Sequence, residues 1–192
     1  MKENFPDPAI LNAKTSPMPD KLNLGCGRKH LPNALNLDLV ADTQPDIVHD
    51  LNARPWPFAP NTFAEISAYD VLEHLDDIVA TMEEIHRICR PGAIVRITVP
   101  HFSCANAFTD PTHKHYFSST SFAYFTGDHE FGFYTNVRFK TRKIQIVFFP
   151  SLLNKLVLRL ANAWPQAYER RYAWLFPAWF IFVELEVLKT PA

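Results

Sequence analysis

The 192-residue chain is poor in several features whose absence narrows the possible functions. It holds five glycines and only three cysteines, Cys26, Cys89 and Cys104. The cysteines show no CxxC spacing, which argues against a disulfide framework and a zinc knuckle. No apolar run reaches the ~18 residues of a membrane span, and the first residues lack the apolar segment of a secretory signal. We therefore expect a cytoplasmic protein with reduced thiols.

An excess of charge of one sign is also lacking. The chain has 19 basic and 20 acidic side chains, which give a net charge of −1. This balance, together with the absence of an RNA-binding motif, argues against nucleic acid as a partner. What the chain has in quantity is phenylalanine and proline, 16 of each, which predicts an aromatic-rich interior or pocket and many stiff turns.

Short apolar segments alternate with helical or loop segments, a pattern typical of an α/β fold with a doubly wound, mostly parallel sheet. We expect strands at 22–24, 35–39, 46–49, 63–69, 93–99, 137–149 and 180–188. Apolar spacing predicts a long helix over 71–90, with Glu73 in its first turn, where it would pair with Arg87 or with backbone donors. Residues 151–174 predict two helical segments split by Pro165.

The length fits a single domain over residues 1–192. We expect it to consist of an arm (1–19), a ligand-binding core (21–101), a lid or substrate loop (102–136), a helical insertion (151–179) and a last strand (180–189). In a sheet of this class the ligand binds at the carboxyl ends of the strands.

A glycine turn and two carboxylates fall at the ends of three predicted strands. Gly25 and Gly27 follow the first strand, Asp38 ends the second, and Asp50 follows the third. Glycines let a ligand approach the backbone, and a carboxylate at the next strand end can accept ribose hydroxyls. Asp50 lies where an adenine amino group would fall. The pattern predicts a nucleoside site, and NAD is disfavoured because the third glycine of its fingerprint would fall at His30.

Several motifs, in order and at compatible spacing, resemble the small class I S-adenosylmethionine-dependent methyltransferases of the type 11-like kind. The segments that carry the resemblance are Leu22–Gly27, Asn36–Asp38, Asp50–Leu51, Asn61–Phe63, Val71–Leu75 and Glu84–Gly92, within residues 21–101. The resemblance implies a methyltransferase that uses S-adenosyl-L-methionine. It also implies a Rossmann-like sheet of seven strands whose last strand is antiparallel.

The resemblance further implies which residues bind the cofactor. The glycine turn would lie under its methionine part, Asp38 would bind the ribose, and Asp50–Leu51 would lie beside the adenine. The predicted set is Asn23, Leu24, Gly25, Cys26, Gly27, Asp38, Leu39, Asp50, Leu51, Tyr69, Asp70 and His74. The chain departs from the family at Asn23, often acidic there, and at Lys29, often the third glycine. An asparagine can hydrogen-bond the cofactor's ammonium but cannot neutralise it.

A histidine-rich stretch after the fifth strand holds the candidate catalytic residues, His101, His113 and His115. The loop is long enough to fold over the ligand edge, and a histidine suits removal of a proton from an acceptor. Two alternatives stay open beside this role of general base. One is a metal site formed by His101, Asp110, His113 and His115, with the rings of the His-x-His pair on one face of a strand. The other is local hydrogen bonding alone, and our expectation is that no metal is bound.

These features predict methyl transfer to an oxygen or nitrogen atom of a small-molecule acceptor held under the 102–136 loop. One alternative is a non-catalytic module that binds S-adenosylhomocysteine or another adenosine ligand. Another is a methyltransferase acting on a lipid-linked or glycan acceptor at a membrane surface, which the aromatic and basic insertion would suit. Core packing is the favoured role of that insertion, and the sequence does not fix the oligomeric state.

Overall fold

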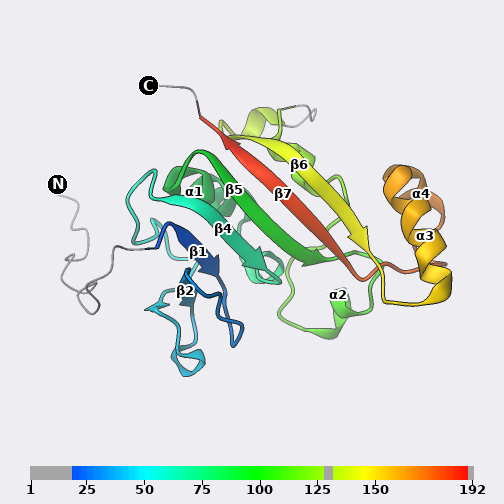
Figure 1. The fold of residues 1–192 in the computed structure, drawn as a ribbon, viewed down its shortest axis with the longest axis horizontal. Helices are drawn as coiled ribbons and strands as arrows, with labels where there is room; N and C mark the ends of the chain where they lie inside the picture. The colour runs from blue at the N-terminus through cyan, green and yellow to red at the C-terminus, as the bar shows by residue number, and fades with distance from the viewer. Residues whose placement is uncertain (1–18, 128–131, 190–192) are drawn as a thin grey trace.

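The structure, a computed structural model, describes residues 19–127 and 132–189, so the predicted arm lies almost wholly outside the described residues. Seven strands form one sheet in the order β3-β2-β1-β4-β5-β7-β6 (Figure 1). The strands are β1 (Lys21–Leu24), β2 (Leu35–Asp38), β3 (Ile47–Val48), β4 (Phe63–Tyr69), β5 (Cys89–Pro100), β6 (Arg138–Val147) and β7 (Phe180–Leu188). β7 runs antiparallel to both of its neighbours, whereas β1 to β5 pair in parallel. The predicted Rossmann-like class, with seven strands and an antiparallel last strand, is confirmed.

In the described ranges, four α-helices and four short 3-10 helices connect the strands. They are η2 (Ala41–Thr43), η3 (Leu72–His74), α1 (Ile78–Ile88), α2 (Asn106–Thr109), η4 (Ser121–Phe125), η5 (Gly132–Tyr134), α3 (Leu152–Ala163) and α4 (Pro165–Arg171). The pair α3 and α4 forms the helical insertion split at Pro165, and it lies at the opposite end of the sheet from β1 and β2 (Figure 1). Within the described ranges, no helix combines the length and apolar character needed to cross a membrane.

The long helix begins later than its apolar spacing predicts. Asp77 has an extended backbone, and its side chain accepts a hydrogen bond from the amide of Ala80, which caps α1 at Ile78. Leu72 and Leu75 are buried in the core without belonging to α1. Their spacing therefore mimicked a helical turn, and the expectation of one helix over 71–90 is wrong.

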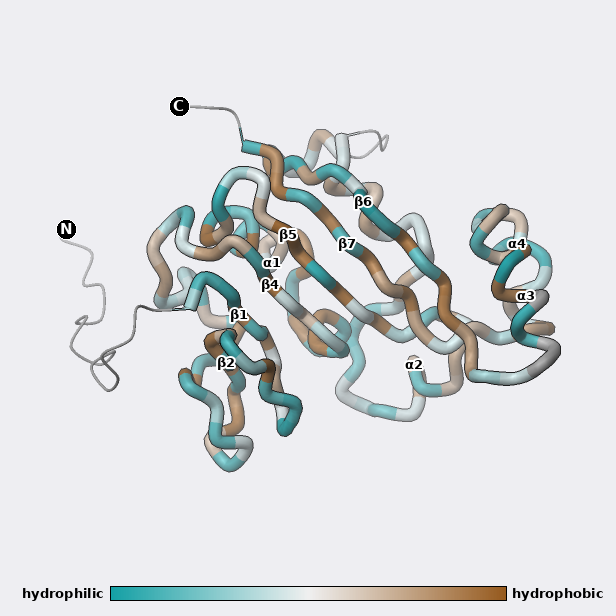
Figure 2. The backbone as a smooth tube through the Cα atoms, in the orientation of Figure 1, coloured by the Kyte–Doolittle hydropathy of each residue, from teal (hydrophilic) through white to brown (hydrophobic). Residues whose placement is uncertain are grey.

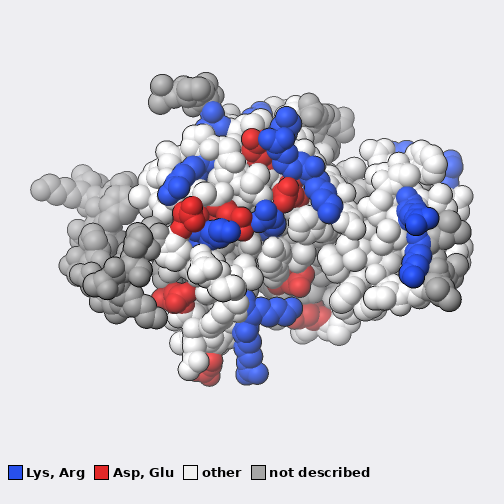
Figure 3. All heavy atoms as spheres, viewed as in Figure 1, with Lys and Arg blue, Asp and Glu red and all other residues white. Residues whose placement is uncertain are grey.

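The two faces of the sheet differ in chemistry. Burial alternates along β5 and β7, so apolar side chains face the core on one side, as the alternating colours of Figure 2 show. Among the half-exposed side chains between the buried ones, Glu65 and Arg96 pair at 2.8 Å, and Arg96 also pairs with Glu184 at 3.0 Å. Mixed charges cover the face of the sheet that Figure 3 shows. In the described part of the chain, no helix covers this face of the sheet. Half-exposed ion pairs between neighbouring strands lie on it instead.

An ion pair on α1 anchors the loop between β3 and β4. Glu84 accepts hydrogen bonds from the Arg87 guanidinium at 2.6 Å and from the Trp56 amide at 2.6 Å. The Trp56 indole in turn donates to the carbonyl of Leu51 at 3.0 Å. Burial by itself would raise the pKa of Glu84, but the bonds from Arg87 and Trp56 hold it below its ordinary value. Arg87 therefore pairs with Glu84, and the predicted pairing with Glu73 is wrong.

Removing the Glu84 carboxylate is expected to lower the free energy of unfolding by about 3 kcal/mol at pH 7, because Glu84→Ala leaves Arg87 and the Trp56 amide without their acceptor. For a domain of this size the melting temperature would fall by about 6 to 12 °C. The contribution is present above the ordinary pKa of 4.5 and is lost as the pH falls through the lower pKa of the folded state. The difference in melting temperature between wild type and Glu84→Ala should therefore become smaller at acidic pH. A difference that does not change with pH would contradict this role of Glu84.

Candidate functional site

A cleft of about 710 Å³ lies at the edge of the sheet where β4 and β5 end and β7 begins. β4 and the residue after it supply Tyr69 and Asp70, β5 supplies Thr98, and β7 supplies Phe180 and Phe182. Because β7 is antiparallel, its first residues meet the carboxyl ends of the parallel strands. The cleft therefore lies at the ligand-binding edge that the fold class predicts.

The glycine turn after β1 combines a tight packing contact with an open position. Gly25 has φ +59°, and a Cβ there would lie 2.3 Å from the Val71 side chain, so packing requires glycine. Gly27 has φ +49°, and its Cβ would meet nothing within 4 Å. Asp38 accepts a hydrogen bond from the amide of Gly27 at 2.7 Å. The structure thus brings Gly27 and Asp38 together beside open space, as the nucleoside site requires.

Large apolar side chains lie exposed next to Asp38. Leu39 and Val40 are 62% and 50% exposed, and Val48 on β3 is 55% exposed. Asp50, after β3, accepts a hydrogen bond from the amide of Asn52 at 2.9 Å, and Leu51 is buried. Apolar side chains at this edge suit the faces of a purine ring, and Asp38 suits ribose hydroxyls. The residues present fit S-adenosylmethionine.

Two of the predicted cofactor residues support the turn from inside. Asn23 is buried, and its amide nitrogen donates to the carbonyl of Lys29 at 3.1 Å and to Asn36 Oδ1 at 2.9 Å. Cys26 is also buried, and its backbone amide donates to the carbonyl of Leu37 at 3.0 Å. Burial, followed by the Asp38 charge, raises the pKa of the Cys26 thiol, which keeps it protonated. Both residues fix the shape of the turn.

Only one of the three candidate histidines lines the cleft. His113 does so, whereas His101 is fully buried and contacts Ser103 Oγ at 2.8 Å and Glu169 Oε1 at 3.2 Å. The ring of His115 contacts the carbonyl of Leu75 at 2.8 Å. Residues 113–115 form no strand, so the expectation that both rings of the His-x-His pair share one strand face is wrong.

Glu73 is the site residue that sequence reasoning placed in a structural role. It lines the cleft with 1% of its surface exposed, and its Oε1 lies 4.0 Å from His113 Nε2. Burial, followed by the charges of Asp70 and Asp110, raises the pKa of Glu73 to about 7. Its position just after β4, at the ligand edge, is the signal that could have identified it.

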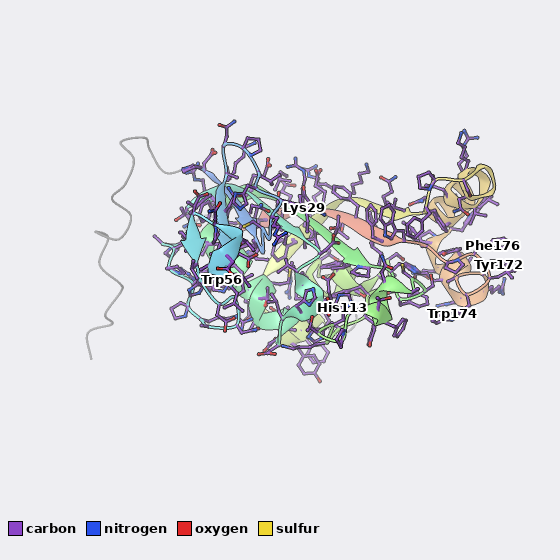
Figure 4. The ribbon with its side chains drawn as sticks, turned by 90° about the horizontal axis from the view of Figure 1, so that it is seen from below. Lys29, Trp56, His113, Tyr172, Trp174 and Phe176 are labelled. Carbon is purple, nitrogen blue, oxygen red and sulfur yellow. The ribbon has the colours of Figure 1, made fainter. Side chains whose placement is uncertain are left out.

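The predicted lid loop is tied to the same turn. The amide of Lys114 donates to the carbonyl of Glu73 at 2.7 Å, and the rings of His74 and His113 lie edge to face at 4.7 Å. Burial, followed by the proximity of His113, lowers the pKa of His74. Lys29, from the glycine turn, lines the cleft together with His113, and Figure 4 labels both. The cleft is therefore enclosed by segments from both halves of the chain.

Comparison with known proteins finds one family model that matches part of the chain. Residues 28–97 match the model of a family described as a methyltransferase domain. No curated protein matches the chain. The matched segment contains Asp38, Asp50, Asp70 and Glu73, so it includes most of the strand ends that form the site.

Solved structures share the fold at low sequence identity. An S-adenosylmethionine-dependent methyltransferase from Archaeoglobus fulgidus is 16% identical over 86% of this chain and 85% of that chain, with a TM-score of 0.60. A second, from Mesorhizobium loti, is 15% identical over 86% and 89%, with a TM-score of 0.57. The [4+2]-cyclase SpnF also shares the fold, at 14% identity over 88% and 75% with a TM-score of 0.55, so the fold by itself does not determine the reaction. Residues 28–97, about a third of the chain, thus match a methyltransferase domain, and the chain as a whole has the fold of S-adenosylmethionine-dependent methyltransferases.

Proposed function

We propose that the chain is an S-adenosylmethionine-dependent methyltransferase, which transfers the methyl group to an oxygen or nitrogen atom of a small molecule bound in the cleft. The observation that carries the proposal is the lining of the cleft, which combines the polar side chains of Glu73 and His113 with the aromatic side chains of Phe180 and Phe182. A volume of about 710 Å³ suits a small molecule, and polar groups set in an apolar wall can orient it. Tyr69 and Asp70 border both this cleft and the proposed cofactor position.

Catalysis in this proposal depends mainly on positioning. The cofactor would lie along Gly27, Asp38 and Asp50, with its methyl group directed past Tyr69 into the cleft. Methyl transfer forms a bond from the acceptor to the methyl carbon as the bond from that carbon to sulfur breaks, and S-adenosylhomocysteine leaves. The nucleophile must be aligned with the breaking bond, and a cleft lined on several sides provides that alignment. His113 would orient the acceptor's reacting group.

The lobe formed by α3 and α4 supports a second candidate, a lipid-linked acceptor at a membrane surface. Trp164, Trp174 and Leu175 are 64%, 68% and 70% exposed. Figure 4 shows aromatic side chains gathered after α4, and basic side chains lie on the face of this lobe that Figure 3 shows. Exposed tryptophans beside arginines suit a membrane interface.

Incubation with methyl-labelled S-adenosylmethionine and a cell extract tests both candidates. The extract is then separated into aqueous small molecules, lipids and macromolecules, and Asp38→Ala is the control for background label. We expect protein-dependent label on an O-methyl or N-methyl group of an aqueous small molecule. Label in the lipid fraction would support the second candidate instead. Label only in macromolecules, or no label from a protein that binds the cofactor, would overturn the proposal.

A further inference from the structure

The ring of His113 has a fixed tautomer. Its Nδ1 lies 3.0 Å from the backbone carbonyl of Ala107. A carbonyl can only accept a hydrogen bond, so Nδ1 carries the hydrogen, and in the neutral ring Nε2 keeps its lone pair. That Nε2 is the atom that faces Glu73.

The ring of His74 is fixed in the same way through a hydroxyl group. Its Nδ1 lies 2.8 Å from Thr112 Oγ1, and the Thr112 hydroxyl donates its one hydrogen to Asp110 Oδ1 at 2.7 Å. Thr112 must therefore accept from His74, so Nδ1 carries the hydrogen and Nε2 keeps the lone pair. Asp110 thus determines the tautomer of His74 through Thr112.

Glu73 completes a group of three electron-pair donors. Its carboxylate is 1% exposed, and among the described residues Oε2 has no hydrogen-bond partner. The 4.0 Å from Oε1 to His113 Nε2 is too long for a hydrogen bond. One ligating atom each from Glu73, His74 and His113 lies within 4.8 Å of the others. Glu73 is buried and the two rings are half-buried, and lone pairs that converge in this way suit a cation bound between them.

We propose that Glu73, His74 and His113 bind a divalent transition-metal ion of the Zn²⁺ type at the wall of the acceptor cleft. Two imidazoles and one carboxylate favour Zn²⁺ or Co²⁺ over Mg²⁺ and Ca²⁺, which prefer oxygen ligands. Bonds of about 2.0 to 2.2 Å bring tetrahedral ligands to roughly 3.3 Å from one another, so the three groups close in by about an ångström. The hydrogen bonds from the rings to Ala107 and Thr112 are of the kind that orients metal-binding histidines.

Three protein ligands leave a coordination position open toward the cleft. Resting on the proposed function, we assign this position to the acceptor's oxygen or nitrogen. A bound hydroxyl would give its proton to solvent more readily because the ion stabilises the oxyanion, which then attacks the methyl carbon. Binding of the ion itself does not depend on the proposed function.

Titration with Co²⁺ and Zn²⁺, after treatment with a chelator, tests the site. We expect one ion per chain, with visible Co²⁺ absorption bands that disappear when Zn²⁺ is added. Glu73→Gln and His113→Ala should each weaken binding by at least about 100-fold, because each removes a ligand. The matched control is His115→Ala, which removes a nearby ring that contacts the Leu75 carbonyl and should leave binding unchanged. Glu73→Gln preserves side-chain shape, and its melting curve without metal checks the fold.

No saturable binding with either ion in excess would overturn the proposal, as would binding that survives both variants. The methyl-transfer assay repeated with a chelator separates this inference from the proposed function. Methyl transfer by a protein that binds no metal would support the proposed function and reject the proposed metal site. Stoichiometric metal binding without methyl transfer would support the metal site and reject the proposed function.

Discussion

Replacing Asp38 with alanine is expected to weaken the binding of S-adenosylhomocysteine by at least about 100-fold. A carboxylate that accepts two ribose hydroxyls makes two charge-assisted hydrogen bonds, each worth about 1.5 kcal/mol or more, and their sum corresponds to that factor. Asp38 ends β2 beside the open side of Gly27, so its carboxylate is in place before a ligand binds. Isothermal titration calorimetry of wild type and variant measures the change.

The control for this experiment is Asp42→Ala, which removes an exposed acidic residue in η2, four positions further along the chain. Its affinity should equal that of wild type. Because Asp38 also accepts from the Gly27 amide, the melting temperature of Asp38→Ala without ligand shows whether the turn survives. An Asp38→Ala variant that is folded and binds at wild-type affinity would remove Asp38 from the site.

Replacing His113 with alanine is expected to lower the rate of methyl transfer by about 10²- to 10⁴-fold while S-adenosylhomocysteine binding stays within a factor of two or so. His113 lines the acceptor cleft, whereas Gly27, Asp38 and Asp50, proposed to bind the cofactor, are not among the residues that line it. The loss should therefore appear in turnover and not in cofactor affinity. Single-turnover transfer of labelled methyl to the identified acceptor measures it.

His115→Ala serves as the comparison, because it removes a ring from the same loop that contacts the Leu75 carbonyl outside the cleft lining. We expect less than a tenfold loss. Equal losses in His113→Ala and His115→Ala would mean that the loop acts as a whole, and would contradict a specific role for His113.

The approach of Asp38 to the glycine turn could be predicted from sequence because its signals are local. A glycine turn after one strand and a carboxylate at the end of the next lie within 14 residues of each other, and parallel pairing brings them together. The structure places the Gly27 amide 2.7 Å from Asp38. Strand periodicity and turn residues were sufficient to predict this contact, whereas cofactor binding there stays a prediction.

The acceptor side could not be predicted in the same way, because it depends on contacts between distant segments. The Lys114 amide reaches the Glu73 carbonyl over 41 residues of chain, and no local pattern encodes that contact. His101 follows a strand at the ligand edge, yet α4 supplies Glu169, which covers it. The helix start was missed for another reason: the Asp77 cap outweighed apolar spacing that continued through Leu72 and Leu75.

Titration of the wild-type protein with S-adenosylhomocysteine, beside NAD, tests most directly that the edge formed by Gly27, Asp38 and Asp50 is the cofactor site of a methyltransferase. We expect the protein to bind one S-adenosylhomocysteine per chain and no NAD. At about 100 times its Kd the ligand adds ~2.7 kcal/mol, which raises the melting temperature of a domain of this size by about 5 to 10 °C. No binding of S-adenosylhomocysteine, or equal binding of NAD, would contradict this expectation.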